Sequence, residues 1–127
     1  MREQKFFFCK HCGNLVGMIE NAGVKLMCCG ESMVELIPNT VDASKEKHVP
    51  QVLVSNDTVT VNIGSVPHPM ISEHYIKWIY LETYSGGQRK CLKPEQEAAT
   101  TFKLSAGDAA VRVFAYCNLH GLWSSDI

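Results

Sequence analysis

The sequence has no excess of charge of either sign and no long apolar run. Its 127 residues include 12 lysines and arginines against 13 aspartates and glutamates, which gives a formal net charge of -1. Nucleic-acid-binding domains and polybasic membrane anchors are usually strongly basic, so this balance argues against both classes. No segment approaches the roughly 18 consecutive apolar residues of a membrane-spanning helix. We therefore expect no nucleic-acid partner and no membrane partner.

An export signal is missing as well. Residues 1–5 are mostly charged or polar, and only Phe6–Phe8 provides apolar side chains before Cys9. A secretory signal needs an apolar core of about 7–15 residues, so the sequence predicts a cytoplasmic protein. Thiols stay reduced in that compartment, and clustered cysteines there indicate metal binding rather than disulfides.

Internal repeats and low-complexity stretches are also absent. Hydrophobic residues make up 46% of the chain and charged residues 20%, an ordinary composition for a globular protein. Six cysteines and five histidines stand out from this background. Because both side chains are metal ligands, their spacing is the part of the sequence that bears most directly on function.

Four of the cysteines form two close pairs near the start of the chain. Cys9 and Cys12 enclose two residues, and Cys28 and Cys29 follow as an adjacent pair. A Cys-x-x-Cys turn lets two thiolates converge on one ion, and four such sulfurs make a tetrahedral site for zinc or iron. So short a segment cannot build a sufficient core alone, and we expect the metal to supply part of its stability.

A hairpin is expected between the two cysteine pairs. Residues 14–20 and 24–27 are rich in apolar side chains and are separated by the turn-like sequence Asn21-Ala22-Gly23. Two such runs about a short turn are typical of a β-hairpin, which would return the second cysteine pair to the first.

The adjacent second pair distinguishes this group from an ordinary zinc ribbon, which has Cys-x-x-Cys at both ends. The segment Phe8–Asn14, together with Cys28-Cys29-Gly30, resembles the iron module of desulforedoxin. From the residues alone, a structural zinc knuckle and a disulfide between the adjacent cysteines remain alternatives. His11 lies inside the first pair, and we expect an exposed loop residue because four thiolates already fill the metal shell.

The remainder of the chain is rich in β-forming residues. Residues 37–45 contain proline, asparagine, aspartate and serine with little apolar content, which indicates a linker between two domains, residues 1–37 and residues 38–127. Short strands separated by turn residues predict an all-β chain whose second domain is an immunoglobulin-like antiparallel β-sandwich. The expected strands are 51–55, 58–64, 74–84, 100–104 and 110–117.

Four of the five histidines fall in this β-rich part, at or near the ends of expected strands or in loops. They are His48, His68, His74 and His120, and Cys117 lies three residues before the last of them. Loops at the end of a rigid scaffold can direct such side chains to one point. The spacing predicts a mixed imidazole–thiolate site for zinc or iron, with ordinary surface or core histidines as the alternative.

The segments around these residues resemble a known family. Glu46–Pro50, Gly64–Met70, Glu73–Tyr75 and Cys117–Gly121 are similar, in this order, to the iron-site segments of superoxide reductases. With the four-cysteine module before them, nearly the whole chain resembles the two-iron class of superoxide reductase, the desulfoferrodoxins. The resemblance leaves Cys91 without a metal, and we expect it to be a partly buried strand thiol.

The resemblance implies two irons per chain, one Fe(Cys)4 centre and one Fe(His)4(Cys) centre. In the second centre the four imidazoles would lie in a plane, with the thiolate axial and the opposite face open. The first iron would be bound by Cys9, Cys12, Cys28 and Cys29, and the second by His48, His68, His74, His120 and Cys117.

The resemblance also implies a reaction and its partners. Superoxide would take up one electron and two protons to give hydrogen peroxide, without production of dioxygen. Electrons would come from rubredoxin or a similar small donor, and the chain would form a homodimer.

Two charged residues would act at the open face of the second iron. Lys47 would attract the superoxide anion and order a proton-delivering water. Glu46 would take the sixth position of the oxidised iron once product has left. The alternative for both is a solvated run of charges.

Two rival functions fit the residues alone. One is a non-enzymatic electron-transfer or metal-binding protein whose histidine site has no open position. The other is a zinc-ribbon interaction module, which the adjacent cysteine pair and the lack of a basic face argue against.

Overall fold

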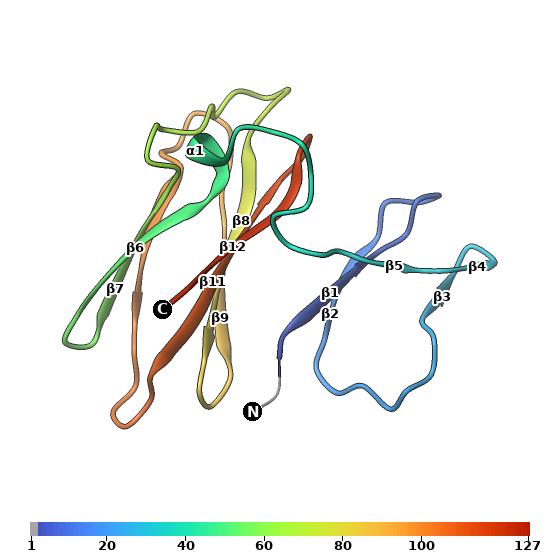
Figure 1. The fold of residues 1–127 in the computed structure, drawn as a ribbon, viewed down its shortest axis with the longest axis horizontal. Helices are drawn as coiled ribbons and strands as arrows, with labels where there is room; N and C mark the ends of the chain where they lie inside the picture. Colours follow the sequence, from blue (N-terminus) through green and yellow to red (C-terminus); the bar gives the residue numbers. More distant parts are fainter. Residues whose placement is uncertain (1–2) are drawn as a thin grey trace. The chain divides into compact units, whose positions relative to one another are not determined.

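The protein is represented by a computed structural model that describes residues 3–127 (Figure 1). Contacts between residues divide the chain into two compact units, Met1–Ile37 and Pro38–Ile127. Within the described residues, regular structure consists of twelve strands and one four-residue helix, α1 (Lys45–His48). The prediction of an all-β chain is therefore confirmed. No helix of residues 3–127 has the length and apolar character needed to cross a bilayer.

The first unit contains a three-stranded antiparallel sheet and a two-stranded ribbon. Its strands are β1 (Lys5–Phe8), β2 (Leu15–Met18), β3 (Met27–Cys28), β4 (Glu31–Ser32) and β5 (Val34–Glu35). β1 lies between β2 and β5 in the sheet, and β3 pairs with β4 in the ribbon. The β1–β2 and β3–β4 pairings each place two cysteines at the end of a short ladder.

The hairpin predicted between residues 14–20 and 24–27 is wrong. β2 pairs with β1, and Met27 belongs to the ribbon formed by β3 and β4. The aromatic run Phe6–Phe8 has high strand propensity, and it supplies the partner for β2 across the first Cys-x-x-Cys turn. The sequence-based prediction left this run unassigned.

The second unit is a sandwich of two antiparallel sheets. The first sheet contains β6 (Pro50–Ser55), β7 (Thr58–Ile63) and β10 (Ala99–Lys103). The second contains β8 (Ile76–Thr83), β9 (Gly87–Cys91), β11 (Ala110–Cys117) and β12 (Gly121–Asp126). The strand orders are β10-β7-β6 and β12-β11-β8-β9.

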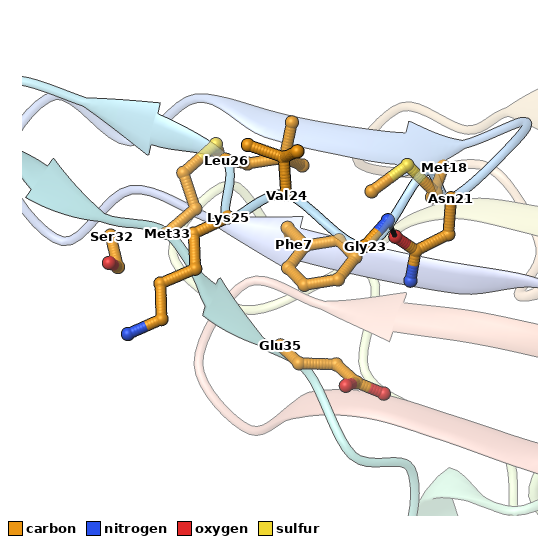
Figure 2. A pocket seen from close by; sticks show the side chains of 10 residues that line it. All are labelled: Phe7, Met18, Asn21, Gly23, Val24, Lys25, Leu26, Ser32, Met33 and Glu35. Atoms are coloured by element: carbon orange, nitrogen blue, oxygen red, sulfur yellow. Dashed lines mark hydrogen bonds between the residues drawn. The ribbon is translucent and has the colours of Figure 1, made fainter.

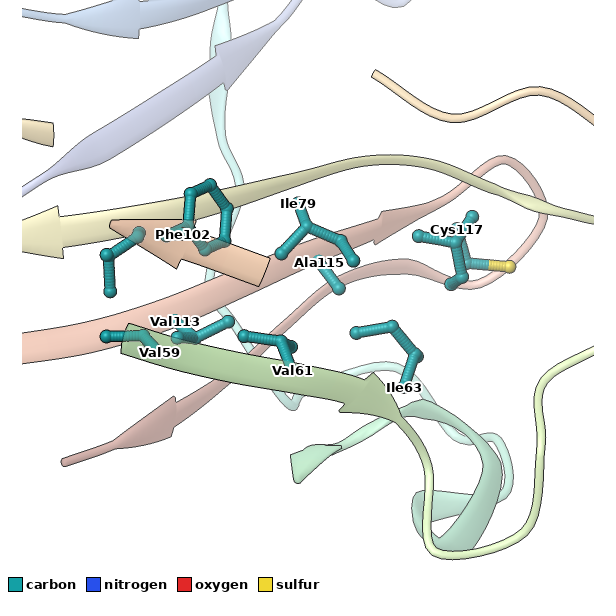
Figure 3. Close-up of a cluster of buried hydrophobic side chains, with 10 residues drawn as sticks. Val59, Val61, Ile63, Ile79, Phe102, Val113, Ala115 and Cys117 are labelled. Atoms are coloured by element: carbon teal, nitrogen blue, oxygen red, sulfur yellow. The ribbon is translucent and has the colours of Figure 1, made fainter. Parts of the chain in front are cut away.

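Side chains from both sheets form one apolar core (Figure 3). Alternate residues of β7 point into it, as its period-two pattern predicted. Burial of each such valine, leucine or isoleucine contributes about 1.5–3 kcal/mol, so the sandwich is held together by apolar contacts. The core includes Val59, Val61, Ile63, Ile76, Ile79, Leu81, Phe102, Val113, Ala115 and Cys117.

Two strands of the second sheet were missed by the sequence analysis. β9 has the sequence Gly-Gln-Arg-Lys-Cys, and it lies at the edge of the sheet, where polar residues are tolerated. β12 begins one turn after Cys117 and pairs with β11 along its whole length. Its serines and aspartate hide the strand pattern, although Leu122 and Trp123 are buried.

The segment expected to be a linker is anchored on the second unit. The backbone N–H of Asn39 donates to the carbonyl of Leu122 at 3.0 Å. The Asn39 side chain accepts from the Ser124 N–H at 2.9 Å and donates to the Ser124 carbonyl at 3.2 Å. Asn39 has φ of 64°, a left-handed conformation that asparagine adopts more readily than most residues. The chain thus reaches α1 from a fixed point on β12.

Candidate metal centres

The first unit brings four cysteines into one cluster. The sulfurs of Cys9, Cys12, Cys28 and Cys29 all lie within 4.8 Å of one another. Cys9 and Cys12 occupy the turn after β1, which is closed by two hydrogen bonds of 2.9 Å between the backbone of Cys9 and that of Gly13 and Asn14. The second pair occupies the turn between β3 and β4, where Cys29 has φ of 53°.

The electrostatics of this cluster favour a bound cation. The backbone amide of Cys12 lowers the pKa of the Cys9 thiol to about 6. The side chains of Cys12 and Cys9 raise the pKa of the Cys28 thiol, and the same two side chains raise the pKa of the Cys29 thiol to about 12. Cys28 and Cys29 therefore hold their protons in the bare cluster, and a divalent ion favours the thiolate form of all four side chains. The donor set fits zinc or iron.

One histidine and one cysteine, His11 and Cys91, lie outside the two clusters. His11 is exposed, as predicted, and its Nε2 lies 3.1 Å from Glu31 Oε1, an ion pair that joins the two cysteine turns when the imidazole is protonated. Cys91 on β9 is also exposed. The prediction of a partly buried strand thiol is therefore wrong for Cys91, because β9 is an edge strand.

The second unit gathers the remaining candidates at one end of the sandwich. His48 is the last residue of α1, and His68 and His74 lie in the loop between β7 and β8. Cys117 is the last residue of β11, and Figure 3 shows it at the end of the buried cluster. His120 lies in the turn between β11 and β12. Three separate connections of the scaffold thus supply the five side chains.

The five side chains converge. One donor atom from each of His48, His74, Cys117 and His120 lies within 4.8 Å of the others. His68 Nε2 lies 3.2 Å from His48 Nε2. His120 Nδ1 is 3.2 Å from His48 Nε2 and 3.9 Å from Cys117 Sγ.

Backbone carbonyls orient two of the imidazoles. His48 Nδ1 lies 2.6 Å from the Ser44 carbonyl oxygen, and His68 Nδ1 lies 2.7 Å from the Pro69 carbonyl oxygen. A carbonyl accepts only, so each Nδ1 carries the proton and each Nε2 presents its lone pair to the shared centre. His120 differs, because its Nδ1 faces the centre.

Burial favours the neutral form of His48, His68 and His74. Desolvation lowers the pKa of His48 and His74, and it lowers the pKa of His68 to about 4. Burial also raises the pKa of the Cys117 thiol, which is 0% exposed. Neutral imidazole is the form that binds a metal, and a cation returns a buried thiol to the thiolate form.

The pocket fits a metal ion. His74 Nε2 is buried, and it has no hydrogen-bond partner among the described residues. A buried imidazole nitrogen without a partner is costly unless an ion takes its lone pair. Four imidazoles with one thiolate suit zinc or iron.

Two residues that the sequence analysis missed support the ligands. The ring of Trp123 stacks on that of His48, with centroids 4.8 Å apart, and Trp123 Nε1 donates to the His120 carbonyl at 3.0 Å. Asn118 Oδ1 accepts from the Tyr75 N–H at 2.9 Å, and Asn118 Nδ2 donates to the Glu73 carbonyl at 3.0 Å. Asn118 thereby ties the two neighbours of His74 to the turn between Cys117 and His120. Its position between Cys117 and His120 is the sequence feature that could have identified it.

Glu46 and Lys47 lie on α1 and are exposed. The charge of Lys47 acts on the centre: after burial and the neighbouring imidazoles, it contributes to the lowered pKa of both His48 and His74. The positive charge of Lys47 thus acts on two of the imidazoles. The backbone carbonyl of Glu46 accepts from the Val66 N–H at 3.0 Å.

A β-sandwich with four imidazoles and a thiolate, following a four-thiolate unit, defines a class of proteins with two mononuclear metal sites. Comparison with known families gives the particular one. The desulfoferrodoxin family model matches residues 40–126, so the chain belongs to the desulfoferrodoxin family. Desulfoferrodoxins carry two iron centres, and the two donor sets here fit them.

Individual relatives agree with this placement. The chain is 46% identical to a desulfoferrodoxin of Syntrophotalea carbinolica over 93% of this chain and 92% of that protein. It is 38% identical to a desulfoferrodoxin of Nitratidesulfovibrio vulgaris over 98% and 97%. The crystal structure of the superoxide reductase from Treponema pallidum matches with a TM-score of 0.82 and 42% identity, over 98% of this chain and all of that one.

Proposed function

We propose that the protein is a superoxide reductase. One superoxide anion, one electron and two protons give one hydrogen peroxide, and no dioxygen is formed. The observation that carries the proposal is the convergence of four imidazoles and the Cys117 sulfur at one end of the sandwich. The similarity to the superoxide reductase of Treponema pallidum supports it.

The two donor sets have different roles. His48, His68, His74, His120 and Cys117 would hold the second iron, which would supply the electron that reduces superoxide. The carbonyls of Ser44 and Pro69 keep two imidazoles in the tautomer that binds metal. The buried Cys117 thiolate would donate electron density to the metal. Cys9, Cys12, Cys28 and Cys29 would hold the first iron.

Lys47 and Glu46 act on substrate and product at the histidine centre. The Lys47 ammonium attracts the superoxide anion and orders a water that delivers a proton. The Glu46 carboxylate would serve as a further ligand for the oxidised iron. Both side chains are exposed on α1, the helix that ends at His48, and this supports both roles.

Electrons reach the protein from rubredoxin or a similar small donor in the cytoplasm. Four thiolates fill the coordination shell of the first iron, so that centre has no position for substrate. Iron–sulfur sites of this kind serve in electron transfer, which makes the four-cysteine centre a relay for the donor's electron.

The protein acts as a homodimer. The first unit exposes Ile19, Val24 and Met27 to 81%, 77% and 62%, a large apolar surface for so small a unit. Val24 also lines a groove of about 310 Å³, together with Phe7 and the oppositely charged Lys25 and Glu35 (Figure 2). A groove with both charges can complement a second copy of itself. Sedimentation should give twice the chain mass, and a monomer at all concentrations would contradict the dimer.

The function is tested by the stoichiometry of its reaction. Protein from iron-replete cells should contain two irons per chain. The reduced protein, mixed anaerobically with superoxide, should yield one hydrogen peroxide per superoxide consumed. Half that yield together with dioxygen would show a dismutase instead. Zinc that persists under iron-replete expression would instead indicate a structural metal-binding module.

The role of Lys47 is tested by Lys47→Ile. Loss of the local cation should slow the second-order reaction with superoxide by roughly tenfold, and it should flatten the dependence of that rate on ionic strength. Stopped-flow mixing at several salt concentrations measures both. Lys45→Ile removes a neighbouring exposed cation of the same charge run and is the matched control. A Lys47→Ile rate equal to that of the unmodified protein would remove Lys47 from the mechanism.

A further inference from the structure

Gly64, the residue after β7, occupies a position where a side chain does not fit. Its φ is +84°, which other residues rarely adopt. A Cβ at this position would lie 2.4 Å from the Val66 carbonyl oxygen, 2.7 Å from the Glu46 carbonyl oxygen and 2.8 Å from the Lys47 carbonyl carbon. All three are backbone atoms, so none can rotate away. Two of them belong to α1.

The close approach at Gly64 allows the two segments to be joined by hydrogen bonds. The Gly64 N–H donates to the Val49 carbonyl at 3.1 Å, and the Val66 N–H donates to the Glu46 carbonyl at 3.0 Å. The Ser65 hydroxyl donates to the same Glu46 carbonyl at 3.3 Å. Residues 64–66 therefore hold the backbone of α1 on both sides of His48.

The helix needs this support. A four-residue helix is far below the length at which a helix is stable alone in water. Within it, the Lys47 N–H reaches the Ser44 carbonyl only at 3.3 Å. The Lys47 side chain is exposed, so its place is set by the backbone of α1 rather than by side-chain packing.

We propose that Gly64 is a positioning residue: by lacking a side chain, it lets residues 64–66 hold α1 so that Lys47 stands where it attracts superoxide. The proposal rests on the proposed function for the role of Lys47. The holding of the helix backbone by Gly64 does not depend on that role.

The test compares two alanine variants with the same backbone strain. Gly64→Ala places a methyl group against the backbone of α1. Gly107→Ala is the control, because Gly107 has φ of +83° but no atom within 4 Å of its Cβ position. Both variants place alanine at a positive φ and share that backbone strain. Only Gly64→Ala also brings a methyl group against the backbone of α1.

The first measurement needs no turnover. Amide hydrogen exchange of residues 44–50 and 64–66 is followed by mass spectrometry in protein loaded with zinc. Gly64→Ala should speed exchange in both segments by about tenfold or more, since it opens the hydrogen bonds between them. Gly107→Ala should leave both unchanged. Equal exchange in the two variants would overturn the proposal.

The second measurement links the backbone to Lys47. With iron content unchanged, Gly64→Ala should lower the second-order rate with superoxide by several-fold and flatten its dependence on ionic strength, as Lys47→Ile does. The double variant should be no slower than Lys47→Ile alone, because both changes act through one charge. Additive losses, or an unchanged salt dependence in Gly64→Ala, would overturn the proposal.

A milder variant covers the case in which Gly64→Ala does not fold or loses iron. Ser65→Ala removes only the hydroxyl bond to the Glu46 carbonyl. It should produce smaller changes of the same kind in exchange and in salt dependence, and no change in either would overturn the proposal. If the unmodified protein does not react with superoxide, the proposed function fails, whereas the exchange comparison still decides whether Gly64 holds α1.

Discussion

Replacement of Cys117 by serine should abolish the thiolate-to-iron absorption of the oxidised histidine centre and spare that of the four-cysteine centre. Cys117 is 0% exposed and closes the apolar core at the end of β11, so the slightly smaller hydroxyl fits the same space. A serine hydroxyl stays protonated near neutral pH and donates far less electron density than a thiolate. We expect superoxide reduction to fall by about a hundredfold, at the upper end of losses from altered metal environments.

Visible spectra and metal analysis of the purified variant measure this effect. Cys91→Ser is the matched control, because Cys91 is the cysteine outside both clusters and is exposed on the edge strand β9. That control should keep both absorption bands and full activity. A band of the histidine centre that survives in Cys117→Ser would show that the ligand assignment is wrong.

Replacement of Trp123 by leucine should weaken both the sandwich and its metal site. Trp123 is 0% exposed, stacks on His48 and donates to the His120 carbonyl. Loss of a buried aromatic ring costs about 3 kcal/mol of the free energy of unfolding. Because two ligands lose their support together, we expect the affinity of the histidine centre for metal to fall by roughly 10–100-fold.

Denaturant unfolding of metal-free protein and titration with zinc measure the two losses separately. Trp123→Phe keeps a ring against His48 but has no N–H for the His120 carbonyl, so its losses should be intermediate. If Trp123→Leu lowers stability without lowering metal affinity, Trp123 is a core residue and does not support the ligands.

The donor residues of both sites could be found from the sequence because their chemistry is restricted to a few residue types. Cysteine and histidine are uncommon, so their spacing is informative before any fold is known. The alternation of Val59, Val61 and Ile63 likewise predicted β7 correctly, since a strand with one buried face repeats every two residues. These signals are local and survive without knowledge of the partner strand.

The features that were missed depend on tertiary context. The pairing of β1 with β2 was not predicted, because Leu15–Met18 could form a hairpin with the residues on either side. The aromatic run before Cys9 is the partner that the fold selects. β9 and the exposure of Cys91 follow from an edge position that no local pattern reveals. Asn118 and Trp123 donate to the backbone carbonyls of Glu73 and His120, and neither bond can be read from sequence spacing, so their support becomes visible only in the fold.

The spread of the ligands along the chain has a consequence for the order in which the metals are acquired. The four cysteines lie between residues 9 and 29, and a loop of that size closes at little entropic cost, so this site can capture its ion while the chain is still forming. The other five donors are spread from His48 to His120 and meet only after β11 has paired with β8 and β12. We therefore expect the histidine pocket to form late in folding, so that iron delivered before the sandwich closes cannot bind there.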